Sequence, residues 1–274
     1  MKKYPKITVV TPSFNQGQFI EATIQSVLGQ EYPNLEYIIC DGGSTDGTVD
    51  ILKKYDDKIA WWCSEKDKGQ SNAINKGMRR ATGDIVCWIN SDDVLLPGAL
   101  LAVAKFYSNH PDTDFANGYT VEIDKEGTII NFTHIIMSHF FFRHGCYNIS
   151  QPGMFWKRAI FDKVGYLDES FHAKMDVEWL IRVYEAGLKV RRINCNLGAI
   201  RIYPETKTAQ GGAIWKHDAD ALKDKYHGQY LPENNKLYQP FFKLYKLLNG
   251  CKLRNAIRKW QYCGKPFTAY KENL

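Results

Sequence analysis

The feature that most limits the possible folds is a regular alternation of short apolar and amphipathic segments in the N-terminal third of the chain. The apolar segments are rich in β-branched and aromatic residues, which indicates buried strands. The segments between them repeat apolar residues at the spacing of one helix face. The predicted strands are 7–10, 37–40, 59–63 and 85–89, and the predicted helices are 18–29, 48–55 and 70–80. This alternation predicts an α/β fold with a parallel sheet and right-handed crossovers.

The rest of the chain is less regular. Two β-rich segments on either side of the turn 124–127 indicate an antiparallel hairpin. The expected elements are strands at 115–123, 128–132, 155–157 and 190–202 and helices at 158–164 and 176–186. A chain of 274 residues, 44% apolar and 24% charged, is long enough for one α/β domain with an appendage or for two domains. We place a boundary near Gly211–Gly212, with a helical tail beyond it.

Positive charge is concentrated in this tail. The formal net charge is +6, yet residues 235–274 alone carry nine Lys or Arg and a single acidic residue, Glu272. Between 238 and 262, basic residues alternate with apolar and aromatic ones at helical spacing, which is typical of a helix that lies on an anionic membrane. A helix packed on the domain with a solvated basic face fits the pattern equally well. Nucleic-acid binding is not favoured, because no recognition motif accompanies the charge.

The stretch Asn90–Asp93 is the clearest candidate for chemistry. The adjacent carboxylates of Asp92 and Asp93 follow the predicted strand 85–89, and open α/β sheets bind ligands at that end of their strands. Neighbouring carboxylates repel each other, and a hard divalent cation that bridges them to phosphate oxygens suits the pair. The alternative is a capping aspartate before a helix that starts near Pro97, beside a solvated neighbour.

The glycine-rich loop 41–47 also follows a predicted strand. The Asp41 carboxylate can accept a hydrogen bond from a base N–H, and the glycines let the backbone approach a flat ligand. The glycines lack the GxGxxG spacing of a dinucleotide site, and the sequence contains no P-loop. The alternative is a glycine-rich turn in which Asp46 caps the next helix.

Five groups of motifs, in order, resemble family 2 glycosyltransferases of the GT-A fold. They are TVVTPSFN (8–15), DGGSTDGT (41–48), SEKDKGQSNAINKG (64–77), NSDD (90–93), and the set QP (151–152), VGYLDE (164–169) and MDVEWL (175–180). The resemblance covers roughly residues 5–210 and implies a Rossmann-like half and a mixed, mainly parallel central sheet flanked by helices. It implies a catalytic domain at 1–212, with a nucleotide-sugar-binding half at 1–95 and an acceptor-binding half at 96–212. A basic helical extension at 213–274 would follow.

On the donor side, the resemblance implies that Thr11 and Pro12 line the pocket for the nucleotide base. Asp41 would hydrogen-bond the base imide, which favours uracil or thymine. Asp67, in the loop after the third strand, would contact the nucleotide or the donor sugar.

For catalysis, the resemblance assigns Asp92 to the ribose and donor sugar, and Asp93 to Mg²⁺ or Mn²⁺ on the diphosphate. Lys207 and Arg201 would add positive charge at the diphosphate, although a surface lysine is usually only solvated. Asp176 would be the general base that deprotonates the acceptor hydroxyl. An in-line attack on the anomeric carbon would invert its configuration.

The acceptor side is assigned to Gln151 and Glu178. Relatives often carry an aspartate at the position of Glu178, so the base assignment lies between Asp176 and Glu178, and the position in the motif favours Asp176. The QxxRW signature of processive members is absent, which favours transfer of a single sugar.

These features predict transfer from a UDP- or dTDP-sugar to a glycan or lipid-linked acceptor, in bacterial-type surface polysaccharide or glycan assembly. The enzymatic alternative is a nucleotidyltransferase, although the loop 13–17 has no Lys or Arg to grip a triphosphate. A non-catalytic nucleotide-sugar-binding module is the other alternative, and the presence of both Asp93 and Asp176 argues against it.

The cysteines and histidines carry less information. Seven cysteines without a CxxC motif, and a first strand that leaves no room for a signal peptide, favour a cytoplasmic protein, peripheral on the inner face of a membrane if the tail binds lipid. His134, His139 and His144 lack the spacing of metal ligands on a helix. We therefore favour an aromatic loop that is buried or lines the acceptor cleft, together with Phe140–Phe142, over a metal site.

Overall fold

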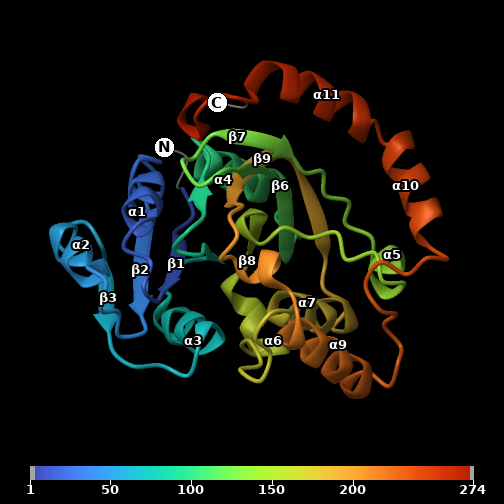
Figure 1. Cartoon of the computed structure of the whole chain (residues 1–274), viewed down its shortest axis with the longest axis horizontal. Coiled ribbons are helices and arrows are strands. Elements are labelled where there is room, and N and C mark those ends of the chain that lie inside the picture. Colours follow the sequence, from blue (N-terminus) through green and yellow to red (C-terminus); the bar gives the residue numbers. More distant parts are fainter. Residues whose placement is uncertain (1–3, 272–274) are drawn as a thin grey trace.

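The computed structural model of the chain describes residues 4–271. Its centre is a nine-stranded sheet with the strand order β3-β2-β1-β4-β8-β6-β9-β5, and β7 pairs with β6 outside this path. Helices cover both faces of the sheet (Figure 1). The predicted α/β class is therefore confirmed.

The N-terminal part alternates strands and helices as predicted. Its elements are β1 (Ile7–Ser13), α1 (Ile20–Leu28), β2 (Leu35–Asp41), α2 (Thr48–Lys54), β3 (Trp61–Ser64), α3 (Gln70–Arg80) and β4 (Ile85–Trp88). Strand β1 pairs in parallel with β2 and β4, and β2 pairs in parallel with β3. All four strands therefore end at the same edge of the sheet, where ligands of open α/β sheets bind.

The second half contains both parallel and antiparallel pairs. Its elements are β5 (Val94–Leu95), α4 (Ala99–Asn109), β6 (Phe115–Ile123), β7 (Ile129–Phe132), α5 (His139–Arg143), β8 (Met154–Lys157), α6 (Phe161–Val164), α7 (Met175–Glu185) and β9 (Val190–Arg201), with 3-10 turns at Gln151–Gly153 and Arg158–Ile160. Strand β6 forms the predicted hairpin with β7, and it also pairs with β8 and with β9. The register between β6 and β9 shifts on both sides of Tyr119, which pairs with Asn196.

Two apolar layers hold the helices on the sheet. Successive strand residues face opposite layers, so Val9 packs in one layer and Val10 in the other. Helices α1 and α4 close the first layer, for example through the fully buried Val103. Helices α3 and α7 close the second, where Trp179 is fully buried.

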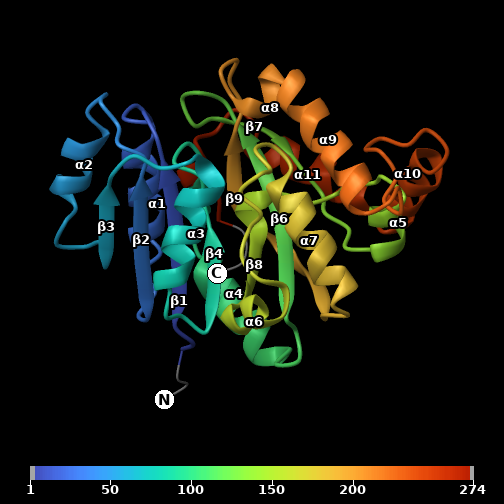
Figure 2. The same cartoon turned by 90° about the horizontal axis from the view of Figure 1, so that it is seen from below.

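The predicted helical tail consists of several helices. They are α9 (Ala213–Lys225), α10 (Gln239–Leu248) and α11 (Cys251–Tyr262), followed by a 3-10 turn at Phe267–Ala269, and the short α8 (Lys207–Gln210) lies just before the predicted boundary. Helix α9 packs into the second apolar layer through Leu222. Helices α10 and α11 curve around the outside of the molecule, from α5 to the region of β7 (Figure 1), and a view turned by 90° again shows α10 beside α5 (Figure 2). Within residues 4–271, no helix has the length and apolarity needed to cross a bilayer.

After α11 the chain returns to the sheet. The Ile129 amide donates to the Lys265 carbonyl at 2.8 Å, and the Gly264 amide donates to the Ile129 carbonyl at 2.9 Å. Tyr270 is fully buried in a third apolar cluster with Ile123 and Phe132, and its hydroxyl accepts a 2.6 Å hydrogen bond from Asn196 Nδ2. The tail is thus attached to the sheet domain at both ends.

Candidate active site

A pocket of about 790 Å³ lies at the C-terminal ends of the parallel strands. Strands β1 and β4 pair with Val10 opposite Trp88, so the segments that follow them leave the sheet side by side. These segments bring Ser13 and Asp92 to the pocket. Residues predicted to act on donor, metal or acceptor that line it are Pro12, Asp67, Asp92, Asp93, Gln151, Asp176, Arg201 and Lys207. The predicted donor and acceptor sides therefore share one cavity.

Two predicted donor residues, Thr11 and Asp41, lie beneath the wall of the pocket rather than among its lining residues. Thr11 is fully buried, and its hydroxyl lies 3.1 Å from the Tyr37 hydroxyl. The Asp41 carboxylate is buried and accepts hydrogen bonds from the Ser44 amide at 2.8 Å and from the Ser64 hydroxyl at 2.6 Å. In this structure Asp41 shapes the loop 41–47, and its contact with a base stays a prediction.

The lining residues Gly42 and Asp67 fit together closely. A Cβ atom on Gly42 would lie 2.8 Å from Asp67 Oδ2, so a side chain at position 42 would displace the Asp67 carboxylate. The other oxygen of Asp67 accepts a hydrogen bond from the Gly69 amide at 2.8 Å. The glycine at position 42 therefore permits a close approach that fixes Asp67 at the pocket.

The adjacent carboxylates of Asp92 and Asp93 differ in their surroundings. Asp93 is 4% exposed, and its Oδ1 accepts the Arg201 amide at 2.9 Å while Oδ2 accepts Asn90 Nδ2 at 3.1 Å. Burial, and then repulsion from Asp92, raise the pKa of Asp93 well above its ordinary value. Asp92 is half-buried, and its Oδ2 accepts the Tyr203 hydroxyl at 2.8 Å. Asp92 is thus the more accessible of the two.

This pair suits a divalent cation. The available donors are the carboxylate oxygens of Asp92 and Asp93, which are the hard ligands that Mg²⁺ and Mn²⁺ accept. A cation beside them would relieve the repulsion that raises the pKa of Asp93. Within residues 4–271 no three His, Cys, Asp or Glu side chains converge as a metal cage, so most ligands would come from substrate phosphates and water.

Arg201 and Lys207, the two basic side chains predicted to act at the diphosphate, have different surroundings. The Arg201 guanidinium is buried and donates to the carbonyls of Asp92 at 2.8 Å and of Lys125 at 2.7 Å, so it holds the loop of the acid pair against the β6–β7 turn. The Lys207 ammonium donates to Gln70 Oε1 at 2.6 Å. Lys207 reaches across the pocket from α8 to α3, where it can swing toward an anionic ligand.

Asp176 lies in the first turn of α7, where a negative charge is favoured by the helix dipole. Its side chain lines the pocket, and its Oδ1 accepts a 2.8 Å hydrogen bond from the Val177 amide. Burial raises the pKa of Asp176 to about 6. A carboxylate with such a pKa can hold and release a proton near neutral pH, which a general base requires.

The loop before Asp176 is held by a carboxylate from the tail. Asp218 of α9 is fully buried, and its Oδ2 accepts hydrogen bonds from three successive amides, those of His172 at 2.9 Å, Ala173 at 2.7 Å and Lys174 at 2.9 Å. These amides precede α7 and have no partners within that helix. Helix α9 thereby fixes the start of α7 and the position of Asp176.

The pocket contains polar atoms that the protein leaves without partners. Gln151 Nε2 donates to the Trp88 carbonyl at 2.5 Å, but Gln151 Oε1 has no hydrogen-bond partner among the described residues. Ser13 Oγ is likewise buried without a partner in that part of the chain. Since buried polar groups are rarely left unpaired, these atoms indicate a ligand that completes the pocket.

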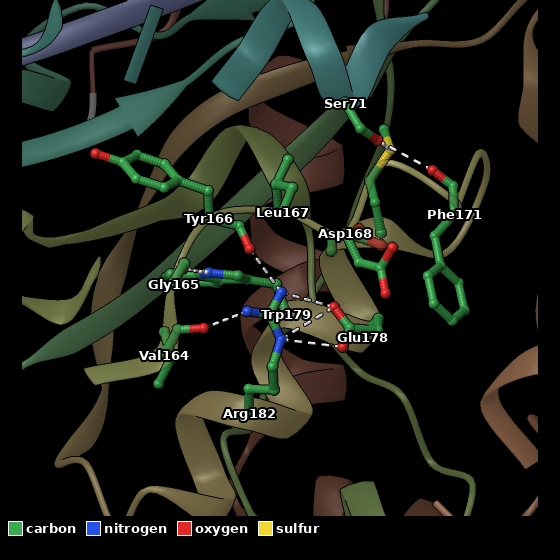
Figure 3. Close-up of polar contacts among 12 residues, drawn as sticks. Ser71, Val164, Gly165, Tyr166, Leu167, Asp168, Phe171, Glu178, Trp179 and Arg182 are labelled. Carbon is green, nitrogen blue, oxygen red and sulfur yellow. Dashed lines mark hydrogen bonds and ion pairs between the residues drawn. The ribbon is translucent and has the colours of Figure 1, made fainter. Parts of the chain in front are cut away.

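The structure does not bring Glu178 to this pocket. Glu178 is fully buried in the same first turn of α7, where it binds the Arg182 guanidinium at 2.8 Å, Lys225 Nζ at 2.9 Å and the Tyr226 hydroxyl at 2.9 Å. Arg182 also donates to the carbonyls of Val164 and Tyr166, so the network fixes the loop 164–167 (Figure 3). The geometry lends no support to an acceptor contact by Glu178, and it favours Asp176 as the base.

The three histidines lie apart and pack against different aromatic rings. His134 stacks on Tyr119 with centroids 4.1 Å apart, and His139 stacks on Tyr184 at 4.5 Å. His144 lies 4.1 Å from the Tyr238 ring. Burial lowers the pKa of His134 to about 3, so its ring is neutral. This arrangement is that of an aromatic loop.

Several pocket residues were not singled out from the sequence. Lys174 is almost fully buried, and its Nζ binds Glu233 at 2.5 Å and lies 4.3 Å from the Trp215 ring centroid. Trp215 and Glu233 both line the pocket although they come from beyond the predicted catalytic boundary. No motif marks them, because their place in the pocket depends on how the tail folds back.

Solved structures with the same architecture are glycosyltransferases of the GT-A fold. S. aureus TarS in complex with UDP superposes with a TM-score of 0.56 at 18% identity, covering 73% of this chain and 61% of that chain. The mannosyltransferase PcManGT from Pyrobaculum calidifontis in complex with GDP-Man and Mn²⁺ gives a TM-score of 0.61 at 18% identity, covering 81% of this chain and 65% of that chain. The predicted GT-A fold is thus confirmed.

The chain belongs to glycosyl transferase family 2, whose model matches residues 8–165. It is 45% identical over 133 residues to the putative teichuronic acid biosynthesis glycosyltransferase TuaG of Bacillus subtilis, which is 47% of this chain and 53% of that protein. It is 33% identical over 129 residues to the GalNAc(5)-diNAcBac-PP-undecaprenol beta-1,3-glucosyltransferase of Campylobacter jejuni, which is 46% of this chain and 41% of that protein. The matches span about half the length of these relatives.

Proposed function

We propose that this chain is an inverting, metal-dependent glycosyltransferase that moves a single sugar from a UDP- or dTDP-sugar to a glycan or lipid-linked acceptor. One observation carries the proposal. An acid pair suited to a cation, Asp92 and Asp93, shares one pocket with Asp176, a carboxylate whose pKa is raised to about 6.

The comparisons support the substrate classes. TarS has been solved with UDP and with UDP-GlcNAc, and PcManGT with GDP-Man and Mn²⁺. The Campylobacter jejuni relative is named for an acceptor linked to undecaprenol, and TuaG for teichuronic acid biosynthesis. We infer from them a nucleotide-sugar donor, a divalent cation and an acceptor in surface polysaccharide assembly.

A bound Mg²⁺ or Mn²⁺ would neutralise the charge that grows on the departing diphosphate. Asp93 would hold the cation, and we extend this role to Asp92, which the sequence assigned to the ribose and donor sugar, because its carboxylate is adjacent and the more accessible of the two. Asp67 would contact the nucleotide or donor sugar from the position that Gly42 permits. Lys207 would turn from Gln70 toward the diphosphate and add a further positive charge.

Asp176 would act on the acceptor. The acceptor hydroxyl oxygen forms a bond to the anomeric carbon while the bond from that carbon to the diphosphate breaks, and the hydroxyl proton passes to the Asp176 carboxylate. Because attack and departure lie on opposite sides of the carbon, the configuration inverts. Gln151 Oε1 would orient a hydroxyl of the substrate, since it has no other partner within residues 4–271.

The test is donor binding with and without metal. Thermal unfolding measured over a set of nucleotide sugars with Mn²⁺ should show stabilisation by UDP- or dTDP-sugars, because a ligand that binds only the folded state raises the melting temperature. Asp92→Asn should abolish the part of the shift that requires Mn²⁺. Asp50→Asn, at an exposed site on α2, is the matched control and should keep the full shift.

Two outcomes would contradict the proposal. A Mn²⁺-independent shift for the unmodified protein would remove the metal from donor binding. An Asp176→Asn variant that still transferred sugar at the unmodified rate would remove Asp176 from the reaction.

A further inference from the structure

The outer face of α10 and α11 carries a band of exposed apolar side chains, which we call the tail face. Leu248, Leu253 and Trp260 are 76%, 69% and 87% exposed. The remaining members, each at least 48% exposed, are Phe241, Leu244, Leu247 and Ile257. So many large exposed apolar side chains on two consecutive helices are unusual for a soluble surface and indicate an interaction site.

Packing on the domain accounts only for the opposite face of these helices. Phe242 is buried with Cys146 and Cys251 in a cluster between α10 and the loop around α5. Asn255 Nδ2 of α11 donates to the Phe132 carbonyl of β7 at 2.9 Å. Both helices are therefore held by their inner sides, which leaves the tail face pointing away from the body.

The charge around the tail face has one sign. From residue 234 to residue 271 the sequence contains nine Lys or Arg and no Asp or Glu. Lys243, Lys252 and Lys259 are exposed and alternate with the apolar members along the two helices. A solvated surface helix normally carries both signs of charge and few large apolar groups, so this face is not explained by solvation.

We propose that the tail face docks on an anionic membrane surface, with its apolar side chains at the level of the headgroups and its lysines on the lipid phosphates. The charge complementarity selects this occupant, because lysines among aromatic and aliphatic side chains match an acidic lipid interface. The two helices form a convex outer arc (Figure 1), a shape that can settle on a deformable lipid surface.

The face is also close to the pocket along the chain. Glu233, which lines the pocket, lies only a few residues before α10 begins at Gln239. The hydroxyl of Tyr147, another lining residue, donates to the Leu231 carbonyl in the same connecting segment at 2.9 Å. Docking would thus hold at the membrane the segment that joins the pocket to the tail face, so that the enzyme and a lipid-linked acceptor would share one surface. That consequence rests on the proposed function, whereas docking itself does not.

The experiment is flotation of the full chain with vesicles of phosphatidylcholine alone or of phosphatidylcholine and phosphatidylglycerol in equal amounts. The unmodified protein should float with the acidic vesicles, and less so as salt is raised, because salt screens the lysines. Replacing Lys243, Lys252 and Lys259 together with glutamine should weaken binding roughly 100-fold. Lys58→Gln, at an exposed site just after α2, is the matched control and should not change it.

The apolar part is tested separately. The double change Leu248→Ser and Trp260→Ser should also reduce flotation, whereas Leu101→Ser, an exposed leucine on α4, should not. Both substituted positions are exposed, so the variants should retain the melting temperature and the Mn²⁺-dependent response to nucleotide. That readout keeps a failure of docking distinct from a failure of the proposed function.

Absence of flotation with acidic vesicles at low salt would overturn the proposal. The protein could instead fail to float but self-associate in sedimentation, with the same serine changes abolishing the self-association. That result would assign the tail face to a second copy of the chain and would also overturn the proposal. Equal flotation of the unmodified protein and the glutamine variant would remove the charge argument.

Discussion

Replacing Asp176 with asparagine is expected to stabilise the protein near neutral pH. Burial raises the pKa of the Asp176 carboxyl from its ordinary value of 3.8 to about 6. At about 1.4 kcal/mol per pKa unit, ionisation of this group costs up to about 3 kcal/mol of folding free energy, and access of the side chain to the pocket lowers this to about 1–2 kcal/mol. Asparagine keeps an oxygen for the Val177 amide and removes the charge.

The sign of the pH dependence follows from proton binding. Between about pH 4 and pH 6 the folded protein holds a proton on Asp176 that the unfolded chain has released, so raising the pH favours unfolding. The contribution is complete above about pH 6, where the carboxylate is ionised in both states. The stability gained by the Asp176→Asn variant should therefore be small in acid, grow through this window and then stay constant.

The assay is urea unfolding followed by tryptophan fluorescence at a series of pH values. Asp168→Asn is the control of opposite sign. Burial alone would raise the pKa of Asp168, but hydrogen bonds from Lys225 and Ser170 outweigh burial and lower this pKa to about 2. The ionised carboxylate of Asp168 therefore stabilises the fold, and the Asp168→Asn change should destabilise the protein at neutral pH. An advantage of Asp176→Asn that was the same in acid and at neutral pH would refute the desolvation of this carboxylate.

The remaining predictions concern residues that shape the site. Gly42→Ala should weaken nucleotide binding in the thermal-shift assay, because the alanine Cβ would force the Asp67 carboxylate aside. Unchanged binding would show that Asp67 can move without affecting the nucleotide. Asp218→Ala should lower the free energy of unfolding in urea by about 3 kcal/mol, because it leaves three amides unpaired. Asp218→Asn should lower it less, since asparagine keeps one acceptor oxygen. Glu178→Ala should lower the free energy of unfolding by about 3 kcal/mol or more, because it leaves Arg182 without its buried partner. The fraction that folds should still bind nucleotide. Loss of nucleotide binding by that fraction would show that Glu178 belongs to the site.

The sequence predicted those parts of the site that follow directly from strand order. Asp67 and Asp92 each come just after a strand of a parallel set and line the pocket, because the ends of such strands must meet at one edge. Periodicity also located α7 to within a residue, with Asp176 in its first turn.

What could not be predicted depends on contacts between segments far apart in the chain. Glu178 and Asp176 are two residues apart in the same motif, and only the rotation of α7 against its neighbours decides that one lines the pocket and the other binds Arg182. The same holds for Trp215 and Glu233, which reach the pocket because α9 folds back on the body. Local pattern does not encode such long-range docking.

The return of the chain to β7 has a consequence for how the protein is handled. Strand β7 would otherwise present Ile129 as an unpaired sheet edge, and the segment around Gly264 covers it through backbone hydrogen bonds. Exposed strand edges template association with other chains. Cutting the chain before α10 would expose both that strand edge and the apolar cluster in which Tyr270 is buried. The truncated protein should therefore aggregate for reasons unrelated to lipid. Point substitutions on the tail face are therefore the better way to separate lipid docking from the structural role of the tail.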